Sequence, residues 1–143
     1  MTDFRKLSEA VLASPQIGVH EIAIAKEAGV TVIVNNRPDG EDPASPQSDD
    51  VEAAAEQAGI AYASIPIGHS GFSEVQIDQM IAVLEGAEGK VLAYCRSGTR
   101  STLLWSLAQA KLGMAPDDIA AAAQGAGYDV TPIRPMLDML AAR

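Results

Sequence analysis

The chain has one cysteine, Cys95, and a cluster of cationic and hydroxyl side chains follows it directly. A thiol acts as a nucleophile in its thiolate form, which nearby positive charge favours. Arg96 and Arg100 provide that charge, so we expect Cys95 to be a thiolate at neutral pH, with Cys95 and Arg100 as catalytic residues. The anion-binding residues expected beside them in this loop are Arg96, Ser97, Gly98, Thr99 and Ser101.

The residues on either side of this loop predict a strand, a tight turn and a helix. Residues 91–94 are apolar and read as a short buried strand, and apolar positions recur at helical spacing from about 100 to 113. Backbone N–H groups that turn inward in such a loop, together with the N-terminus of the next helix, stabilise negative charge. The alternative is that Cys95 is only a small buried apolar residue. Two neighbouring arginines argue against it, since a buried charge is costly without an anionic partner.

The elements that must position this loop follow an α/β pattern. Strands are expected at 30–34, 60–67 and 91–94, the first of them in the centre of the sheet, and residues 1–12 form either a short helix or an edge strand. Helices are expected at 19–28, 49–58, 73–84, 100–113, 116–123 and 135–142. The sequence therefore predicts a single domain over residues 1–143, with a mainly parallel sheet of four to five strands between two layers of helices.

Composition restricts the class of partner. Nineteen acidic residues against ten basic ones give a net charge of −9, which repels the phosphate backbone of nucleic acids. No apolar run approaches the roughly 20 residues of a membrane span, and one cysteine with no partner suits a reducing compartment. We expect a cytoplasmic domain with no nucleic-acid or membrane partner, no metal site and no cofactor.

Two further stretches carry candidate site residues. The acidic, proline-rich loop from 35 to 50 follows a predicted strand and contains Arg37, which either binds anions or forms an ion pair with Asp39 or Glu41. Residues 67–74 contain no aspartate, so a general acid in this stretch would be His69 or Glu74. For Glu74 the simpler interpretation is a place in the capped first turn of a helix.

The loop at 94–101, YCRSGTRS, resembles the active-site loop of single-domain rhodaneses, which also place four residues between cysteine and arginine. Protein tyrosine and dual-specificity phosphatases have five, usually after a histidine, where this chain has Tyr94. Residues 32–41 and 62–67 instead resemble the dual-specificity phosphatase scaffold. Taken together, residues 4–129 resemble the bacterial beta-lactamase hydrolase-like proteins. This resemblance implies a protein tyrosine phosphatase fold of the dual-specificity type and a sulfurtransferase-type activity.

Sulfur transfer fits the residues best at this stage, because sulfite leaves a sulfane sulfur as a stable anion and needs no acid. Cys95 is expected to take sulfur from thiosulfate or a small persulfide and pass it to a thiol or cyanide. Some members of the resembled family are fused to a metallo-hydrolase, and we expect any persulfide-oxidising hydrolase to be a separate protein here. The alternatives are an atypical cysteine-dependent phosphatase that uses Cys95 and Arg100, and a non-catalytic anion-binding module.

Overall fold

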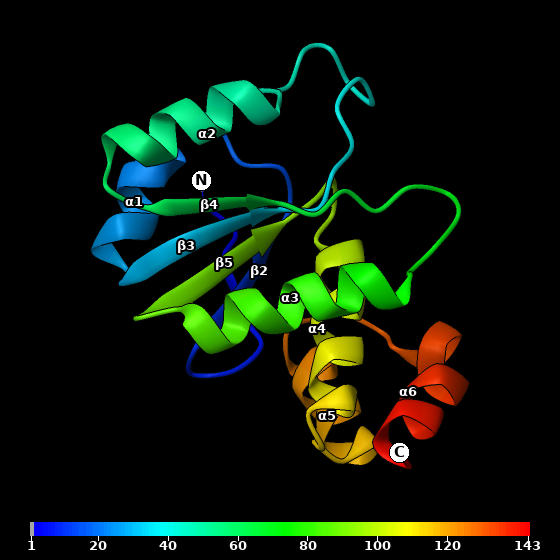
Figure 1. Ribbon diagram of the computed structural model, residues 1–143. Coiled ribbons are helices and arrows are strands. Elements are labelled where there is room, and N and C mark those ends of the chain that lie inside the picture. Colours follow the sequence, from blue (N-terminus) through cyan, green and yellow to red (C-terminus); the bar gives the residue numbers. More distant parts are fainter. Residues whose placement is uncertain (1) are drawn as a thin grey trace.

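The computed structural model describes residues 2–143 as a five-stranded sheet between two layers of helices (Figure 1). The strands are β1 (Arg5–Lys6), β2 (Val11–Ser14), β3 (Val30–Asn35), β4 (Ala61–Ser64) and β5 (Lys90–Tyr94). The helices are α1 (Glu21–Glu27), α2 (Ser48–Gln57), α3 (Glu74–Gly86), α4 (Thr99–Lys111), α5 (Pro116–Gly125) and α6 (Arg134–Ala141), with a 3₁₀ turn at Thr131–Ile133. None of these helices is long and apolar enough to cross a membrane.

The sheet has the strand order β1-β2-β5-β3-β4 and is parallel except for β1, which pairs antiparallel with β2. The predicted fold class, a mainly parallel sheet of four to five strands flanked by helices, is confirmed. The prediction of the central strand was wrong, because β5 holds that place and β3 lies beside it. Both strands are apolar and paired on each side, so composition alone does not rank them. The undecided first dozen residues form the edge strand β1 and the start of β2.

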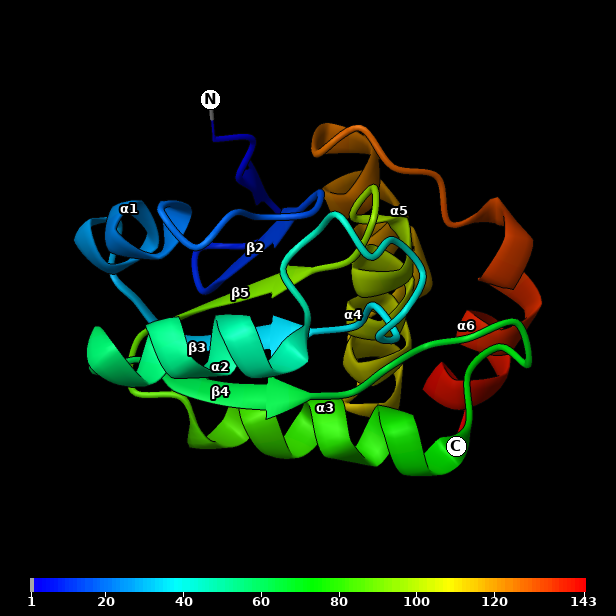
Figure 2. The same ribbon diagram turned by 90° about the horizontal axis from the view of Figure 1, so that it is seen from above.

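Two separate apolar clusters hold the layers together. Helices α1 and α2 cover one face of the sheet, where Ile22 and Val51 pack with Ile33 and Leu92. Helices α3 and α4 lie on the other face, where Trp105 of α4 is buried, and α5 and α6 pack against α4 (Figure 2). Burial of these apolar side chains is the main stabilising contribution, at about 25 cal/mol per Å² removed from water.

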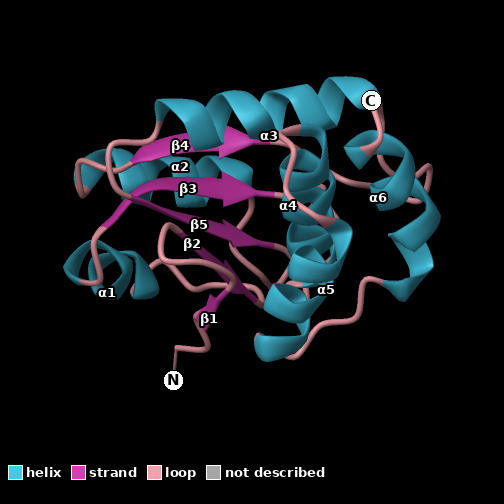
Figure 3. Cartoon of the chain, turned by 90° about the horizontal axis from the view of Figure 1, so that it is seen from below, coloured by secondary structure: helices cyan, strands magenta, loops and turns pink. Residues whose placement is uncertain are grey.

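The parallel strands bring three loops to one edge of the sheet. The loop 36–47 follows β3, the loop 65–73 follows β4 and the loop 95–98 follows β5 (Figure 3). Ligands of open α/β sheets bind at the carboxyl ends of the strands, where such loops meet. The fold therefore places the cysteine loop next to the two other stretches that carry candidate site residues.

Candidate active site

The cysteine loop forms the floor of the site between β5 and α4. Cys95 is fully buried, and the backbone N–H of Gly98 donates a hydrogen bond to its Sγ at 3.1 Å. Gly98 stands at the N-cap of α4 with φ +92°, a left-handed conformation that glycine adopts without strain. An N–H donor and a helix N-terminus both favour negative charge on the sulfur. The predicted strand, loop and helix are confirmed, while the thiolate state of Cys95 stays a prediction.

The three hydroxyl side chains of this loop do different things. Ser97 and Thr99 are exposed and contact each other, with Ser97 Oγ donating to Thr99 Oγ1 at 3.0 Å. Ser101 is fully buried, and its hydroxyl donates to Asn36 Oδ1 at 2.7 Å. This hydrogen bond joins α4 to the end of β3. Because the hydroxyl of Ser101 is buried and already donates to Asn36, the structure does not support the expected contact of Ser101 with an anion.

Arg100 is held rigidly beside the thiol. Its Nη1 donates to Glu41 Oε2 at 2.7 Å and to the carbonyl of Ile67 at 2.8 Å, and its Nη2 donates to Glu41 Oε1 at 2.9 Å. Guanidinium has five N–H donors, so Nε–H and one Nη2–H on the side edge remain for an anion. The pKa of Arg100 is raised, chiefly by the Glu41 hydrogen bonds and, after the opposing effect of burial, by the charge of Cys95.

Glu41 joins Arg37, which was expected either to bind anions or to form an ion pair, to the expected catalytic residue Arg100. Arg37 Nε donates to Glu41 Oε1 at 2.9 Å, and Arg37 Nη1 donates to Gln16 Oε1 at 3.0 Å. Of the two roles expected for Arg37, the ion pair is the one observed, with Glu41 as its partner. The pKa of Glu41 is lowered to about 2, chiefly by the hydrogen bonds from Arg100. Burial acts in the opposite direction and raises this pKa, while the hydrogen bond from Arg37 lowers it further. The carboxylate therefore stays ionised through the neutral range.

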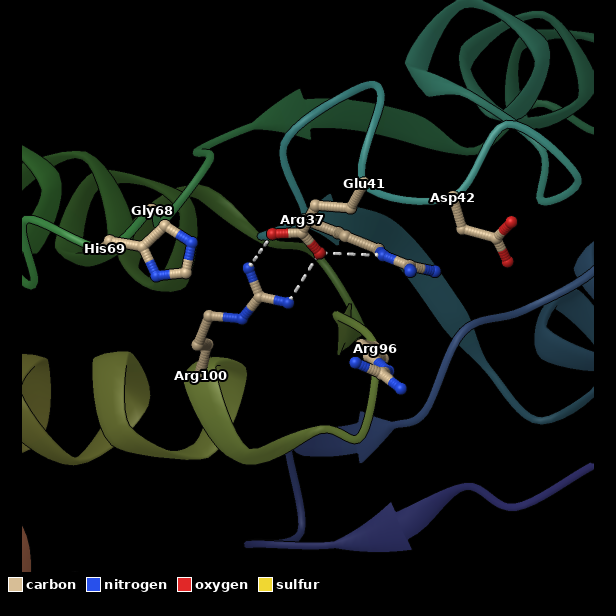
Figure 4. Close-up of a pocket in the computed structure, with 7 residues that line it drawn as sticks. All are labelled: Arg37, Glu41, Asp42, Gly68, His69, Arg96 and Arg100. Atoms are coloured by element: carbon tan, nitrogen blue, oxygen red, sulfur yellow. Dashed lines mark hydrogen bonds and ion pairs between the residues drawn. The ribbon is translucent and has the colours of Figure 1, made fainter.

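A polar pocket of about 640 Å³ opens above the cysteine loop (Figure 4). Three positive and two negative side chains meet in it, together with His69 of the loop after β4. Arg96 lies in this wall, and it is the one arginine of six in residues 2–143 without a carboxylate at ion-pair distance. The lining residues are Arg37, Glu41, Asp42, Gly68, His69, Arg96 and Arg100. Such a lining suits a small hydrophilic anion.

The structure separates the two general-acid candidates. Glu74 lies in the first turn of α3, where it forms ion pairs with Lys111 of α4 at 2.5 Å and with Arg143 at 3.2 Å. Its neighbour Ser73 caps the helix by accepting from the Gln76 backbone N–H, and the Ser73 backbone N–H donates in return to Gln76 Oε1. Glu74 therefore has a structural role, as its simpler interpretation predicts. His69 alone of the two lies in the pocket with Arg100.

Sequence reasoning missed Asn36 and Tyr128. Asn36 is buried, accepts from Ser101 and donates from Nδ2 to the carbonyl of Ile65 at 2.9 Å, which ties the three loops together. Tyr128, from the segment after α5, donates from its hydroxyl to the carbonyl of Ser97 at 3.0 Å. Nothing in the local pattern points to either residue, since each acts on a segment at least 29 positions away.

Fold and site together define a phosphatase-like domain with the protein tyrosine phosphatase fold. The crystal structure of a candidate phosphatase from Neisseria meningitidis Z2491 superimposes with a TM-score of 0.85 at 32% identity, covering 98% of this chain and 99% of that one. The structure of TpbA from P. aeruginosa, at 18% identity, shares the fold with a TM-score of 0.69 and covers 99% and 89% of the two chains.

The chain belongs to the beta-lactamase hydrolase-like protein family, whose phosphatase-like domain matches residues 3–112. The protein of that name from Xylella fastidiosa strain Temecula1 is 34% identical over 125 residues, which is 87% of this chain and 29% of the relative. Its counterpart from Agrobacterium fabrum is 31% identical over 105 residues, 73% of this chain and 24% of that protein. The chain thus spans less than a third of the length of these relatives.

Proposed function

We propose that this domain is a cysteine-dependent phosphatase acting on small, hydrophilic phosphate monoesters. The observation that carries the proposal is that a fixed arginine and an imidazole line one polar pocket, and that this arginine follows the loop that begins with the buried Cys95 thiol. The scaffold that holds them resembles, over nearly its whole length, a candidate phosphatase of known structure. This support favours phosphoester hydrolysis over the sulfur transfer expected from the sequence.

The proposed reaction has two steps. The Cys95 thiolate attacks phosphorus in line, so that the S–P bond forms while the P–O bond to the leaving group breaks. Loop N–H groups and the free edge of Arg100 hold the phosphoryl oxygens and stabilise their charge. Protonated His69 gives its proton to the leaving oxygen. Water then attacks phosphorus, neutral His69 takes its proton, and the P–S bond breaks to release phosphate and the thiolate.

Sulfur transfer is the second candidate, favoured by the four residues between Cys95 and Arg100. In that reaction the thiolate attacks the outer sulfur of thiosulfate, the S–S bond breaks, and sulfite leaves with the bonding electrons. A thiolate or cyanide acceptor then attacks the bound sulfur and restores the Cys95 thiolate. This reaction uses the same thiol and the same arginine but has no need of His69.

One experiment separates the candidates. The protein is incubated in parallel with an aryl phosphate and with thiosulfate plus cyanide, while phosphate and thiocyanate release are measured and the intact mass is recorded after rapid acid quench. We expect phosphate release and an intermediate heavier by one phosphoryl group. Thiocyanate release with a gain of one sulfur atom, and no phosphate, would overturn the phosphatase proposal in favour of sulfur transfer.

Two variants control the assay. Cys95→Ser removes the nucleophile and should abolish both the product and the covalent adduct. Arg100→Lys keeps the positive charge but lacks the planar fork that binds Glu41 and an anion at once, so we expect it to lose most of the rate. If neither product forms in the wild-type protein while phosphate or thiosulfate still binds, the site is a non-catalytic anion-binding module.

A further inference from the structure

Tyr128 does not line the polar pocket, and it contacts the cysteine loop at Ser97 and Gly98. A Cβ built on Gly98 would lie 2.1 Å from the hydroxyl oxygen of Tyr128 and 2.9 Å from its Cζ. The end of the tyrosine ring therefore lies directly against the Cα of Gly98. Glycine is needed here for space as well as for its positive φ.

The hydroxyl of Tyr128 donates to the carbonyl of Ser97 at 3.0 Å. That carbonyl belongs to the same peptide unit as the N–H of Gly98, which donates to Cys95 Sγ at 3.1 Å. The peptide is trans and planar, so its C=O and N–H point in opposite directions. A hydrogen bond that fixes the carbonyl on one side consequently fixes the direction of the N–H toward the sulfur on the other.

Two sets of contacts hold the side chain of Tyr128 in place. Its side chain packs in the apolar cluster around α4, and the guanidinium carbon of Arg5 lies 5.0 Å from the centre of its ring. Arg5 in turn forms an ion pair with Asp3 at 2.9 Å. Burial is the main cause that raises the pKa of Tyr128, so its hydroxyl stays protonated and able to donate.

From this chain of contacts we propose that Tyr128 is a positioning residue for the nucleophile: through the Ser97–Gly98 peptide it aims the Gly98 N–H at Cys95. It touches neither substrate nor reacting atoms, and it lies outside the residues that match the family domain. The effect on turnover rests on the proposed phosphatase function, but the effect on the reactivity of Cys95 does not.

The test compares Tyr128→Phe with Tyr62→Phe. The first removes the hydroxyl and keeps the ring against Gly98. The second removes a hydroxyl that also makes hydrogen bonds, with Asn35 and Ser48, neither of which belongs to the cysteine loop. The readouts are the pH profile of Cys95 alkylation by iodoacetamide, kcat and KM for an aryl phosphate, and thermal unfolding.

We expect Tyr128→Phe to shift the alkylation profile to higher pH and to lower kcat about tenfold, the order of one hydrogen bond, with little change in KM. Tyr62→Phe should leave both unchanged at a similar loss of thermal stability. An alkylation profile for Tyr128→Phe equal to that of the wild type, or an equal shift in both variants, would overturn the proposal. A wild type without phosphatase activity would remove only the kcat readout, since alkylation still reports on the thiol.

Discussion

At the scale of single residues, Glu41 decides how the site is charged. Without it, Arg37 and Arg100 would face each other as like charges with no counterion between them. With Glu41 present, Nη1 and Nη2 of Arg100 bind the two carboxylate oxygens. The Nε–H and the second N–H of Nη2 remain free for a ligand. Glu41 therefore orients Arg100, the cation that we propose binds the substrate anion.

Replacing Glu41 by Gln should lower stability at neutral pH by about 1 to 2 kcal/mol, after allowance for solvent screening of this partly exposed pair. The pKa of Glu41 falls from 4.5 to about 2 on folding, so its contribution is present above pH 4.5 and is lost as pH falls through about 2. Urea unfolding of wild type and variant from neutral pH downward measures this. The two stabilities should converge at low pH.

The exposed Glu85, which has no ion pair within residues 2–143, provides the matched control for this comparison. Its replacement by Gln should leave the pH dependence of unfolding unchanged. A Glu41→Gln variant that loses stability in parallel with the wild type down to pH 2 would contradict the ion-pair account.

His69 can be tested through the leaving group. A general acid matters most when the leaving oxygen is a strong base, so His69→Ala should slow hydrolysis of phenyl phosphate by about 10² to 10⁴ and of 2,4-dinitrophenyl phosphate much less. Steady-state kcat for both esters, in wild type and variant, gives the comparison. An equal loss on the two esters would assign His69 to binding instead of proton transfer.

At the scale of elements, the site depends on three strand ends held in register by Asn36. Its side chain bonds Ser101 and Ile65, while its backbone N–H donates to the carbonyl of Tyr94 at 2.8 Å and its carbonyl accepts from Ile67 at 2.9 Å. The ends of β4 and β5 thus share one small buried amide at the end of β3. This arrangement keeps Arg100, Glu41 and His69 at fixed separations.

Removing this amide by Asn36→Ala leaves the Ser101 hydroxyl and the Ile65 carbonyl buried without these partners, which should cost about 2 to 4 kcal/mol of stability. Ser101→Ala breaks only one of the two bonds and should cost about half as much. Chemical denaturation of both variants gives the two values, alongside kcat for an aryl phosphate. Full activity in a strongly destabilised Asn36→Ala would show that the loops keep their relative positions without it.

The sequence predicts much of the fold because its signals are local. Alternation of apolar runs and helical spacing predicts the inner strands β3 and β5, the edge strand β4 and the order of helices, and the capping box at Ser73 is observed. The Cys95–Arg100 loop follows from the same reasoning. The residues that contact this loop cannot be predicted in the same way. Glu41, Asn36 and Tyr128 are distant from it in sequence and meet it only in the folded domain. The sequence offers Glu41 as a partner of Arg37 but not of Arg100. Each of the three is one polar residue in a polar or mixed segment, so the pattern alone does not place it at the loop.

At the scale of the whole molecule, the residues that line the pocket carry a net positive charge, whereas the net charge of the protein is negative. Its lining carries three arginines against two carboxylates, while the chain as a whole has a charge of −9. Arg96 is the member of this group that forms no ion pair within residues 2–143. We therefore assign to it the attraction of anions from solution, in keeping with the sequence-based expectation.

Arg96→Ala should raise KM for an aryl phosphate several-fold, leave kcat nearly unchanged and weaken the dependence of kcat/KM on salt. Initial rates at low and high ionic strength measure all three quantities. Lys26→Ala is the control, because Lys26 is an exposed cation of α1 outside the pocket. If both variants change KM alike, the effect comes from net charge and Arg96 has no local role.

The packing of α5 and α6 determines which residues a shortened or fused version of this domain must keep. The family match ends at residue 112, just after α4, yet Tyr128, Leu137 and Leu140 are buried in the same cluster as Trp105. A protein engineer who shortened or fused the domain at that boundary would cut through its core and discard the residue that supports the cysteine loop. A fragment meant to keep this core whole must therefore include α5 and α6.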